Sequence, residues 1–543
     1  MNKTETIFCA VAITAVAILL SCNKNVGQAL PPSSAGAVPS VSAVSTASSS
    51  TATGLAPSTP RTAFKESLST LTVPPDPFLT NNGQIPLKEQ YSGPLFTLSH
   101  DWPTSVTPLK DPPWINAIGG GQISTRNAGA YVEALKRYVS ANGRSLILDY
   151  AHWDAKKAGW YNEPWLGIER EAIHGTYEAG QFPPSTFPGT GLRATFDTLV
   201  LTYYDGRAAY TINKLWGPSA MKPAVTTANA QFVEGAIVVK AALFTNDDPA
   251  GPSDWWDAVK GAAEWPLFVS LPEALKPPAV PQVVKGYVMQ FDIIVKDSKS
   301  APKTGWVFST LVYDANATGD AWDKMVPLGA MWGNDPEANS ALSPPPPLHE
   351  NWINPKAPKY STETLGWGGR LSGPNDGAQN AIVVDGKVLP NAADSSCMSC
   401  HGPSEWSLTT NSQASFLLPS FPNPTPPPPF KPCSDGNPND PPSICSPAAG
   451  SPDWMRWFQD RAGTAPQDQG SVALDYDEVF AFKALPLWWK ATGPADQPPP
   501  FLFVRGGRNP AIGEERFNQY TGAPLRNQGS PTPAPSGEPG RGK

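Results

Sequence analysis

Proline is the feature of this sequence that most limits what it can fold into. The chain has 64 prolines in 543 residues, roughly twice the ordinary share. Each proline inside a helix removes a backbone donor and clashes with the preceding turn, so a bundle of long helices is excluded. The 19 tryptophans, 21 phenylalanines and 14 tyrosines still supply large apolar groups for a packed interior. The composition predicts a loop-rich globular protein, and the length predicts two or three domains.

The charge balance excludes one class of partner. Lysine and arginine number 40 against 47 aspartates and glutamates, which gives a net charge of -7. No block of basic residues stands out along the chain. A protein that binds nucleic acid through its phosphates needs such a basic patch, so we expect no nucleic-acid partner.

The first residues predict export from the cytoplasm. Lys3 precedes an uncharged, mostly apolar run over 8–20. Thirteen residues at 1.5 Å each span about 20 Å as a helix, short of the roughly 30 Å of a bilayer core. The run therefore has the length of a signal peptide and not of a permanent membrane span.

The end of this run carries a second signal, Leu19-Leu20-Ser21-Cys22. It resembles the lipobox of bacterial lipoproteins, and the resemblance implies that Cys22 becomes the lipid-modified first residue of the mature chain. Asn23 stands where an aspartate would favour retention in the inner membrane, so the resemblance implies a cell-envelope protein anchored in the outer membrane, outside the cytoplasm. The alternative is an ordinary cleaved signal followed by a chance cysteine.

Composition divides the rest of the chain into four parts. After the signal peptide at 1–21, residues 22–62 are rich in Ser, Thr, Ala and Pro and predict a disordered tether. A β-rich body is expected over 63–350 and a small, loop-rich, partly helical domain over 351–510. A mostly disordered tail should follow over 511–543.

The body is expected to be mainly antiparallel β structure, which makes the fold class α+β. Runs rich in β-branched and aromatic residues occur at 198–204, 208–214, 232–244, 284–296 and 306–313. Asp205-Gly206 between the first two runs predicts a hairpin. Helices are expected at 130–139 and 255–263, the second with Ser253 as N-cap. An antiparallel sandwich and a distorted barrel both fit this pattern.

Potential metal ligands gather near the start of the body. Glu171 and His174 are three residues apart and would share a face if the segment were helical. A closed metal site needs three or four ligands. A structural histidine among aromatic residues, a metal or substrate site, and a haem ligand supplied from outside the haem domain therefore stay open.

The sequence motif that most strongly indicates a functional site is Cys397-Met398-Ser399-Cys400-His401. This C-x-x-C-H sequence resembles the haem-attachment motif of the cytochrome c family. The resemblance implies one covalent haem c per chain, with Cys397 and Cys400 forming thioethers to its vinyl groups and His401 binding the iron. Ser395 or Ser396 could cap a short helix through the motif, and Arg370 could pair with a haem propionate.

Two other interpretations of the motif compete with haem attachment. A C-x-x-C pair can be a dithiol redox site, but no βαβ pattern surrounds it here. A zinc site would need a second ligand pair, and the spacing of Cys433 and Cys445 does not supply one. With Cys397 and Cys400 committed to haem, Cys433 and Cys445 remain, and export to an oxidising compartment predicts a disulfide between them.

The second axial ligand of the iron would separate electron transfer from catalysis. The family usually takes a methionine from downstream of the motif, and Met455 is the one methionine there. Met331, upstream, is the alternative, and a histidine or no protein ligand also remain. Ligation by His and Met suits electron transfer, whereas an open iron position would admit a small molecule.

These inferences lead to a membrane-tethered, monohaem c-type cytochrome that passes single electrons to an unidentified redox partner protein. On this hypothesis the chain is an electron-transfer protein rather than an enzyme, and no catalytic residue is assigned. One alternative is a haem-dependent oxidoreductase, peroxidase- or dehydrogenase-like, whose substrate binds to the β-rich body. Another is a surface-binding protein in which haem is secondary.

Overall fold

The structure is a computed structural model of the 543-residue chain. It describes residues 81, 84–98, 101–182, 184–218, 220–246, 255–269, 281–376, 396–411 and 450–493, together with the short strands at 381–384, 387–390, 431–432, 445–446, 516–517 and 524–525. The predicted signal peptide and tether, including Cys22, lie outside the described residues, as does most of the predicted tail.

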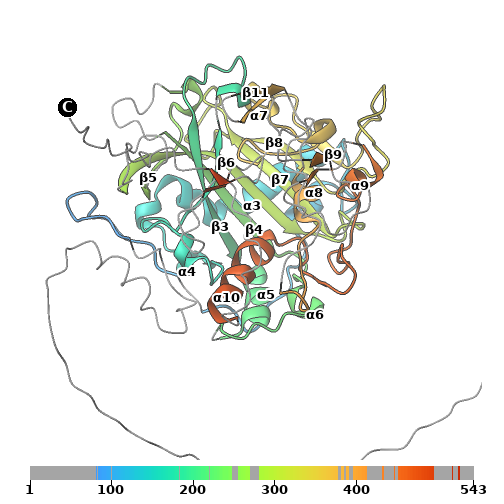
Figure 1. The fold of residues 1–543 in the computed structure, drawn as a ribbon, viewed down its shortest axis with the longest axis horizontal. Coiled ribbons are helices and arrows are strands. Elements are labelled where there is room, and N and C mark those ends of the chain that lie inside the picture. Colours follow the sequence, from blue (N-terminus) through green and yellow to red (C-terminus); the bar gives the residue numbers. More distant parts are fainter. Residues whose placement is uncertain are drawn as a thin grey trace, which may run out of the picture. The chain divides into compact units, whose positions relative to one another are not determined.

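A nine-stranded antiparallel sheet forms the centre of the fold (Figure 1). The strand order is β1-β3-β4-β6-β7-β8-β9, with β2 also paired to β3 and β5 to β6. The α+β class and the antiparallel body are therefore confirmed, and these strands belong to one sheet. Their bounds are β1 Trp160–Tyr161, β2 Tyr177–Phe182, β3 Phe196–Asp205, β4 Ile237–Thr245, β5 Glu264–Val269, β6 Gln282–Lys296, β7 Trp306–Tyr313, β8 Met325–Met331 and β9 Asn351–Ile353.

Four two-stranded pairs complete the β structure of the described residues. Each is two to four residues long, and all are antiparallel except the pair formed by β13 and β14. The pairs are β10 Ala381–Val384 with β11 Lys387–Pro390, β12 Glu405–Trp406 with β15 Val472–Ala473, β13 Lys431–Pro432 with β14 Cys445–Ser446, and β16 Arg516–Phe517 with β17 Pro524–Leu525.

The helices are short except for α3, which confirms the predicted helix at 130–139 and extends it. The α-helices are α2 Pro113–Ala117, α3 Ala128–Leu148, α4 Ala155–Ala158, α5 Gly206–Trp216, α6 Thr227–Ala230, α7 Lys359–Thr362, α8 Cys397–His401, α9 Pro452–Met455 and α10 Leu485–Thr492. A π-helical turn, Val479–Ala484, leads directly into α10. Single 3-10 turns lie at Tyr150–His152, Gly167–Glu169, Pro184–Thr186, Asp257–Val259 and Trp367–Gly369.

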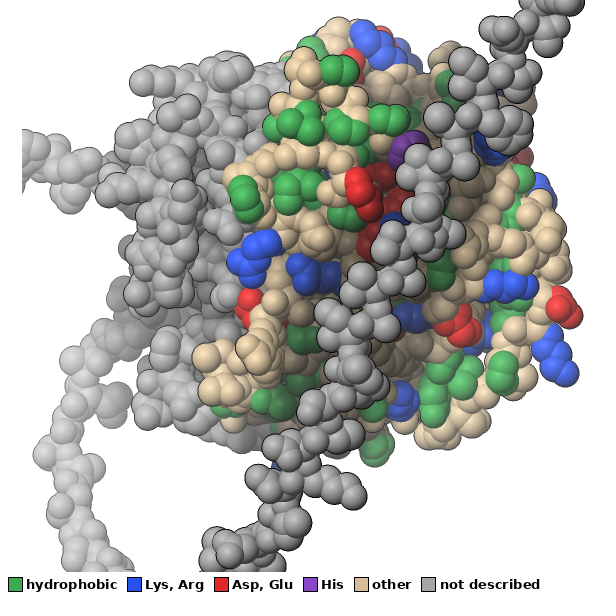
Figure 2. All heavy atoms as spheres, turned by 90° about the vertical axis from the view of Figure 1, so that its right-hand side faces the viewer, with side chains coloured by type: hydrophobic (Ala, Val, Ile, Leu, Met, Phe, Trp, Pro, Cys, Tyr) green, Lys and Arg blue, Asp and Glu red, His purple; other side chains and the backbone are tan. Residues whose placement is uncertain are grey.

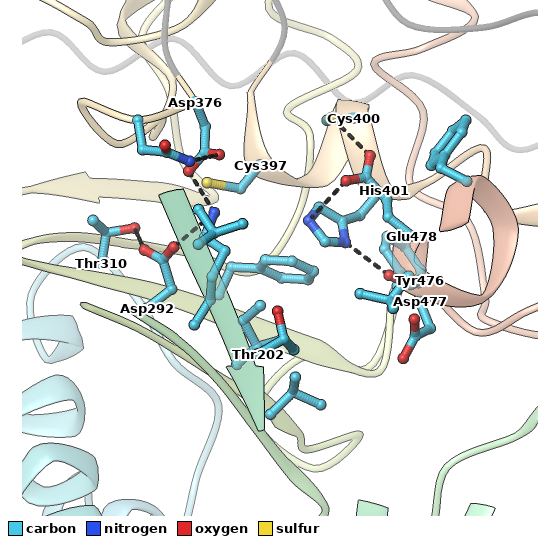
Figure 3. Close-up of a pocket in the computed structure, with 18 of the residues that line it drawn as sticks. Thr202, Asp292, Thr310, Asp376, Cys397, Cys400, His401, Tyr476, Asp477 and Glu478 are labelled. Atoms are coloured by element: carbon cyan, nitrogen blue, oxygen red, sulfur yellow. Dashed lines mark hydrogen bonds and ion pairs between the residues drawn. The ribbon is translucent and has the colours of Figure 1, made fainter. Parts of the chain in front are cut away.

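The two faces of the sheet bury different partners. Side chains alternate along a strand, and on β6 Phe291 packs edge-on against Trp322, whose indole nitrogen donates to Ser140 of α3. The next residue, Asp292, points away from α3 and lines a cavity on the other face. Helix α8 covers that cavity, so α3 and α8 lie on opposite faces of the sheet (Figures 1 and 3).

All five strand predictions can be compared directly with the structure. The run at 198–204 is confirmed as part of β3, and the run at 208–214 is wrong because it lies in helix α5. The runs at 284–296 and 306–313 are confirmed as β6 and β7. The run at 232–244 is confirmed in part, because β4 begins only at Ile237. These segments are long, and both of their faces are buried.

The predicted hairpin at Asp205-Gly206 is wrong. Strand β3 ends at Asp205, and helix α5 begins at the next residue. The Asp205 carboxylate accepts hydrogen bonds from the amides of Arg207 and Ala208 at 3.0 and 2.8 Å, so the residue is a helix N-cap. The residues that follow repeat their apolar positions at helical spacing, burying Ala208, Ile212 and Leu215.

The predicted helix at 255–263 is also wrong, and Ser253 lies outside the described residues. Only a 3-10 turn forms, at Asp257–Val259. Trp256 has an extended backbone, and its indole nitrogen donates to the carbonyl of Thr190. Trp255 and Trp256 are both buried, and the extended backbone at Trp256 keeps a helix from running through them.

One hydrophobic core spans both sides of the predicted domain boundary at residue 350. It contains apolar residues of the sheet together with Met398, Cys400, Trp406 and Phe480. A separate aromatic cluster consists of Trp367, Trp454, Trp457 and Phe458. The residues around the motif are therefore packed onto the sheet.

The surface mixes charge types. Figure 2 shows one face, on which lysine and arginine side chains are scattered among hydrophobic and acidic ones. Acidic side chains gather beside a histidine near the middle of this face. The basic side chains visible there do not form a continuous field.

Candidate functional site

The C-x-x-C-H motif forms helix α8, and its sequence explains why the helix begins there. Ser396 is the N-cap, as predicted, and it forms a capping box in which the Ser399 amide donates to the Ser396 hydroxyl and the Ser396 amide donates to Ser399. The Cys397 amide also donates to the carbonyl of Leu371 at 3.0 Å. Because Cys397 and Cys400 are three residues apart on a helix, both thiols face the same cavity.

His401 is held in one orientation by its neighbours. Its Nδ1 lies 2.8 Å from the Tyr476 carbonyl oxygen, which can only accept a hydrogen bond. Nδ1 therefore carries the proton, and Nε2 is directed toward the Glu478 carboxylate, 3.5 Å from its Oε2. The imidazole also packs edge-on against Phe308, with ring centroids 4.9 Å apart. An imidazole fixed in this way through Nδ1 is typical of a metal-ligating histidine.

The cavity has an empty volume of about 1320 Å³, counting its opening to solvent. Its floor is the sheet face opposite α3, and its roof is α8 with residues 475–483 (Figure 3).

Two rows of side chains cross the cavity floor from strand to strand. The first, which we call the apolar row, consists of directly paired residues on β3, β4, β6 and β7: Tyr204, Val238, Ile294 and Phe308. The second, which we call the polar row, lies two residues away on each strand: Thr202, Lys240, Asp292 and Thr310. The apolar row reaches His401, and the polar row lies on the side of Cys397 (Figure 3).

The polar row is a buried ionic network. Lys240 Nζ lies 3.0 Å from Asp292 and 2.6 Å from Asp376, and the Thr310 hydroxyl donates to Asp292 at 2.7 Å. Burial alone would lower the pKa of Lys240, but the two carboxylates outweigh it and raise that pKa above its ordinary value. Burial raises the pKa of Asp292. The network pins the loop that carries Asp376 against the sheet.

The two thiols have different surroundings (Figure 3). Burial raises the pKa of Cys397, and the nearby carboxylates of Asp292 and Asp376 raise it further. Cys400 Sγ lies 2.7 Å from Glu478 Oε1. A reactive dithiol site needs a thiol with a lowered pKa, so the environment of Cys397 disfavours the dithiol interpretation.

Residues 475–478 complete the site, and the sequence reasoning missed them. The Tyr476 carbonyl binds His401 Nδ1, and Glu478 Oε2 lies 3.5 Å from Nε2. Asp475 and Tyr476 both have positive φ angles, of 49° and 69°. Such angles are unusual for residues other than glycine and tend to occur at functional sites. The detectable signal was the run Asp475-Tyr476-Asp477-Glu478, which places three carboxylates beside a large aromatic ring.

Asp475 anchors this segment beneath the cavity. Its carboxylate accepts hydrogen bonds from Lys296 Nζ at 2.6 Å, from the Trp306 indole at 2.8 Å and from the Phe232 amide at 2.9 Å. These contacts fix the strained turn and so the position of the carbonyl that holds His401.

The two methionines suggested as distal ligands lie elsewhere. Met331 pairs with Phe308 across β7 and β8, and its Sδ accepts a hydrogen bond from the Met398 amide at 3.4 Å. Met455 is half-buried against the aromatic cluster of Trp367, Trp454, Trp457 and Phe458. Neither lines the cavity, and His401 is the one histidine among its described lining residues.

The suggested ligand pair Glu171 and His174 is a structural feature. The Glu171 carboxylate accepts hydrogen bonds from the amides of Ile173, His174 and Phe268. The His174 ring is buried between Tyr150 and Trp265, and burial lowers its pKa to about 3. The segment is a turn and not a helix, so the two side chains do not converge on a metal.

Arg370 does not have the role suggested for it. Its guanidinium is buried and donates to the carbonyls of Asn334, Trp367, Asp335 and Ala338. Its donors are occupied by the backbone, which excludes pairing with a propionate in this arrangement.

The predicted disulfide falls outside what the structure can test. Cys433 and the side chain of Cys445 lie outside the described residues, so their disulfide stays a prediction. Across the described ranges, no set of three or more His, Cys, Asp or Glu is arranged to hold a metal ion.

Comparisons with known proteins do not identify the chain, because no protein-family model, curated protein or solved structure matches it. In the part of the chain that the structure describes, no helix has the length and apolar character needed to cross a membrane.

Proposed function

We propose that this chain carries one covalently attached haem c and transfers single electrons. The observation that carries the proposal is the geometry of His401: its Nδ1 is held by the Tyr476 carbonyl, and the residue lines the same cavity as the two cysteines of the motif. A haem bound there would supply an iron that changes oxidation state by one electron.

The residues present fit such a group. Cys397 and Cys400 would hold it covalently, and His401 Nε2 would bind its iron. The apolar row would pack against the porphyrin and exclude water, because its side chains lie on the cavity floor below His401. The Tyr476 carbonyl keeps the imidazole in the required tautomer.

The test is whether the purified chain contains covalent haem. After export in a host with c-type maturation machinery, the chain should retain one haem after denaturation and acid extraction, measured as a pyridine haemochrome. The double variant Cys397→Ser/Cys400→Ser should lose all covalent haem. A colourless wild-type protein would contradict the proposal.

A second candidate is a haem-dependent oxidoreductase, and one observation favours it. Besides His401, no histidine or methionine is found among the described residues that line the cavity. The iron would then keep an open position, and the polar row would face any small molecule bound there. A high-spin absorption spectrum that changes on adding peroxide would support this candidate, and a low-spin spectrum that does not change would support electron transfer.

The location of the protein is part of the same proposal. Lipidation of Cys22 would tether the folded part to the outer membrane through a flexible segment, near an unidentified redox partner. A variant in which residues 1–22 are replaced by a cleavable signal peptide without a lipobox should leave the membrane fraction and keep its haem. Membrane association that persists in this variant would contradict the lipid anchor.

A further inference from the structure

Asn375 has a buried amide oxygen to which no described residue donates a hydrogen bond. The residue is 3% exposed and lines the cavity. Its Nδ2 donates to Asp376 Oδ1 at 2.7 Å, whereas its Oδ1 has no donor among the described residues. Exchanging the two ends of the amide would set its oxygen against a carboxylate oxygen, so this hydrogen bond fixes the orientation of the side chain.

The loop that carries Asn375 is fixed to the sheet. The Asn375 backbone amide donates to Gln290 Oε1 at 2.8 Å, and Gln290 Nε2 donates to Asp292 and Asp376, at 2.8 Å each. Gly373 lies so close to Gln290 that a Cβ atom there would be 2.4 Å from the side-chain amide. Glycine permits this approach. The Asn375 oxygen is therefore held in one place at the cavity wall.

The charges around the cavity favour a positively charged ligand. Its described lining contains six carboxylates against two lysines: Glu178, Asp292, Asp376, Asp475, Asp477 and Glu478 against Lys240 and Lys483. Asp475 pairs with Lys296, and Lys483 pairs with Glu169, so these two charges are offset from outside the lining. The other carboxylates still outnumber Lys240, and a cavity lined in this way attracts cations and repels anions.

Two other occupants do not suit the Asn375 oxygen. A haem offers it no donor, because vinyl groups carry none and ionised propionates only accept hydrogen bonds. A metal ion needs at least three protein ligands in a closed site, and the described residues contain no such set of His, Cys, Asp or Glu. An ammonium group has three N–H donors and a positive charge, so it matches both the oxygen and the sign of the cavity.

We propose that Asn375 and the polar row bind the ammonium group of a small primary amine. The ammonium donates to Asn375 Oδ1, and the nearby carboxylates of Asp292 and Asp376 supply the opposite charge. Both carboxylates lie on the side of the cavity where Cys397 is found (Figure 3). The site is formed by the chain itself, so the inference goes beyond the proposed function and does not depend on haem.

The test measures binding to the full chain, with any attached haem present, by isothermal titration calorimetry at pH 7. The probe is n-butylammonium chloride, and butyrate and 1-butanol carry the same apolar tail with a negative and a neutral head. Butylammonium should bind with a Kd in the millimolar range or below. Butanol should bind at least about 10-fold more weakly, because it lacks the charge, and butyrate should not bind.

Asn375→Leu removes the acceptor and keeps a similar volume. It should weaken butylammonium binding about 10-fold or more, the effect of losing one hydrogen bond to a charged group. Asn354→Leu is the matched control, because Asn354 also donates from its side chain, to the Pro327 carbonyl at 2.7 Å, but does not line the cavity. It should leave the affinity unchanged. Circular dichroism checks that both variants fold, and the preference of wild type for butylammonium over butanol tests the charge requirement without any variant.

Several outcomes would overturn the inference. Equal affinity for butylammonium and butanol would remove the charge requirement, and unchanged affinity in Asn375→Leu would remove the role of Asn375. A change in the haem spectrum that butylamine still causes in Asn375→Leu would place the amine on the iron. A chain that carries haem but binds no butylammonium would overturn this inference alone, whereas a colourless chain that binds it would support this inference and overturn the proposed function.

Discussion

At the scale of single residues, the site contains buried charged side chains, and each of them is paired with groups that offset its loss of hydration. Lys240 has two carboxylate partners, and Asp475 has a lysine, an indole and an amide. A buried charge is tolerated only when its partners replace the water that it has lost. Removal of one partner should therefore cost more than the pair itself contributes.

Lys240→Met tests this compensation. The substitution leaves Asp292 and Asp376 buried and facing each other, so the free energy of unfolding at pH 7 should fall by about 3–5 kcal/mol. The loss should shrink as the pH is lowered, because protonation then neutralises the two carboxylates. Urea denaturation at several pH values measures both effects.

The control for this prediction removes a carboxylate together with the lysine. Lys240→Met/Asp376→Asn should be more stable at pH 7 than Lys240→Met, because one uncompensated charge is gone. A double variant that is less stable than Lys240→Met would show that packing, and not charge, determines the loss.

Asp477 should make stability depend on pH. Burial raises its pKa to about 7, and Glu163 is buried close enough for the charge of Asp477 to raise the pKa of Glu163 as well. The folded chain then binds more protons than the unfolded one between the unfolded pKa of about 3.9 and pH 7. The stabilising contribution of protonated Asp477 is therefore complete below about pH 4 and is lost as the pH rises through 7.

Asp477→Asn removes this ionisation and keeps a similar shape. Relative to wild type, the variant should gain stability as the pH rises from 5 to 8, by roughly 2–4 kcal/mol, with little further change above that. Chemical denaturation across this pH range measures the difference. A constant difference between the two proteins would contradict the raised pKa.

At this scale, the sequence predicted only those site residues that are neighbours in the chain. Cys397, Cys400 and His401 are adjacent, so their spacing was readable. Tyr476, which orients His401, is 75 residues away along the chain. Lys240 and Asp376 are 136 residues apart. Partners of this kind are brought together by the fold and leave no local pattern.

At the scale of secondary structure, the motif helix is only five residues long, so its ends determine whether it forms. Ser396 and Ser399 satisfy backbone donors at its first turn, and Met331 accepts one more from Met398. A helix of this length has little stability without such contacts. The placement of both thiols therefore depends on the cap.

Ser396→Ala should weaken the helix start and lower the free energy of unfolding by about 1 kcal/mol. It should also slow covalent haem attachment, because the thiols would no longer be held in one arrangement. Ser396→Thr keeps the capping hydroxyl and should recover most of both losses. If Thr behaved like Ala, the effect would come from the cavity wall and not from the cap.

The two errors in predicting secondary structure both arise from tertiary packing, which the local sequence does not reveal. Asp-Gly suggested a turn at 205–206, yet Asp205 caps a helix because the residues after it have an apolar face that packs into the core. The run at 255–263 suggested a helix, yet Trp255 and Trp256 are both buried against Phe196 in one cluster of aromatic rings. Tertiary packing decided both cases, whereas the long strands β6 and β7 were evident from their own residues.

At the scale of the whole molecule, the motif and the sheet share one core. Met398, Trp406 and Phe480 contribute to the same interior as the strands, although the sequence suggested a separate haem domain beginning at 351. Parts that share a core are expected to unfold together.

We therefore expect one cooperative unfolding transition for the described part of the chain. Fluorescence of the tryptophans and far-ultraviolet circular dichroism should give the same urea midpoint, because loss of either part exposes the common core. Glu169→Gln serves as a comparison, because it should lower both midpoints equally. Two separate midpoints would instead support independent domains.

The alternation of cavity and core residues along the central strands also limits how the gene can change. Inserting or deleting a single codon within β4, β6 or β7 would turn every later side chain of that strand over, so charged groups would enter the interior and apolar ones would face the cavity. Substitutions that keep the chain length, and insertions or deletions of two codons at once, leave each side chain on its original face of the sheet. Length variation among natural versions of this protein should therefore be found in its loops.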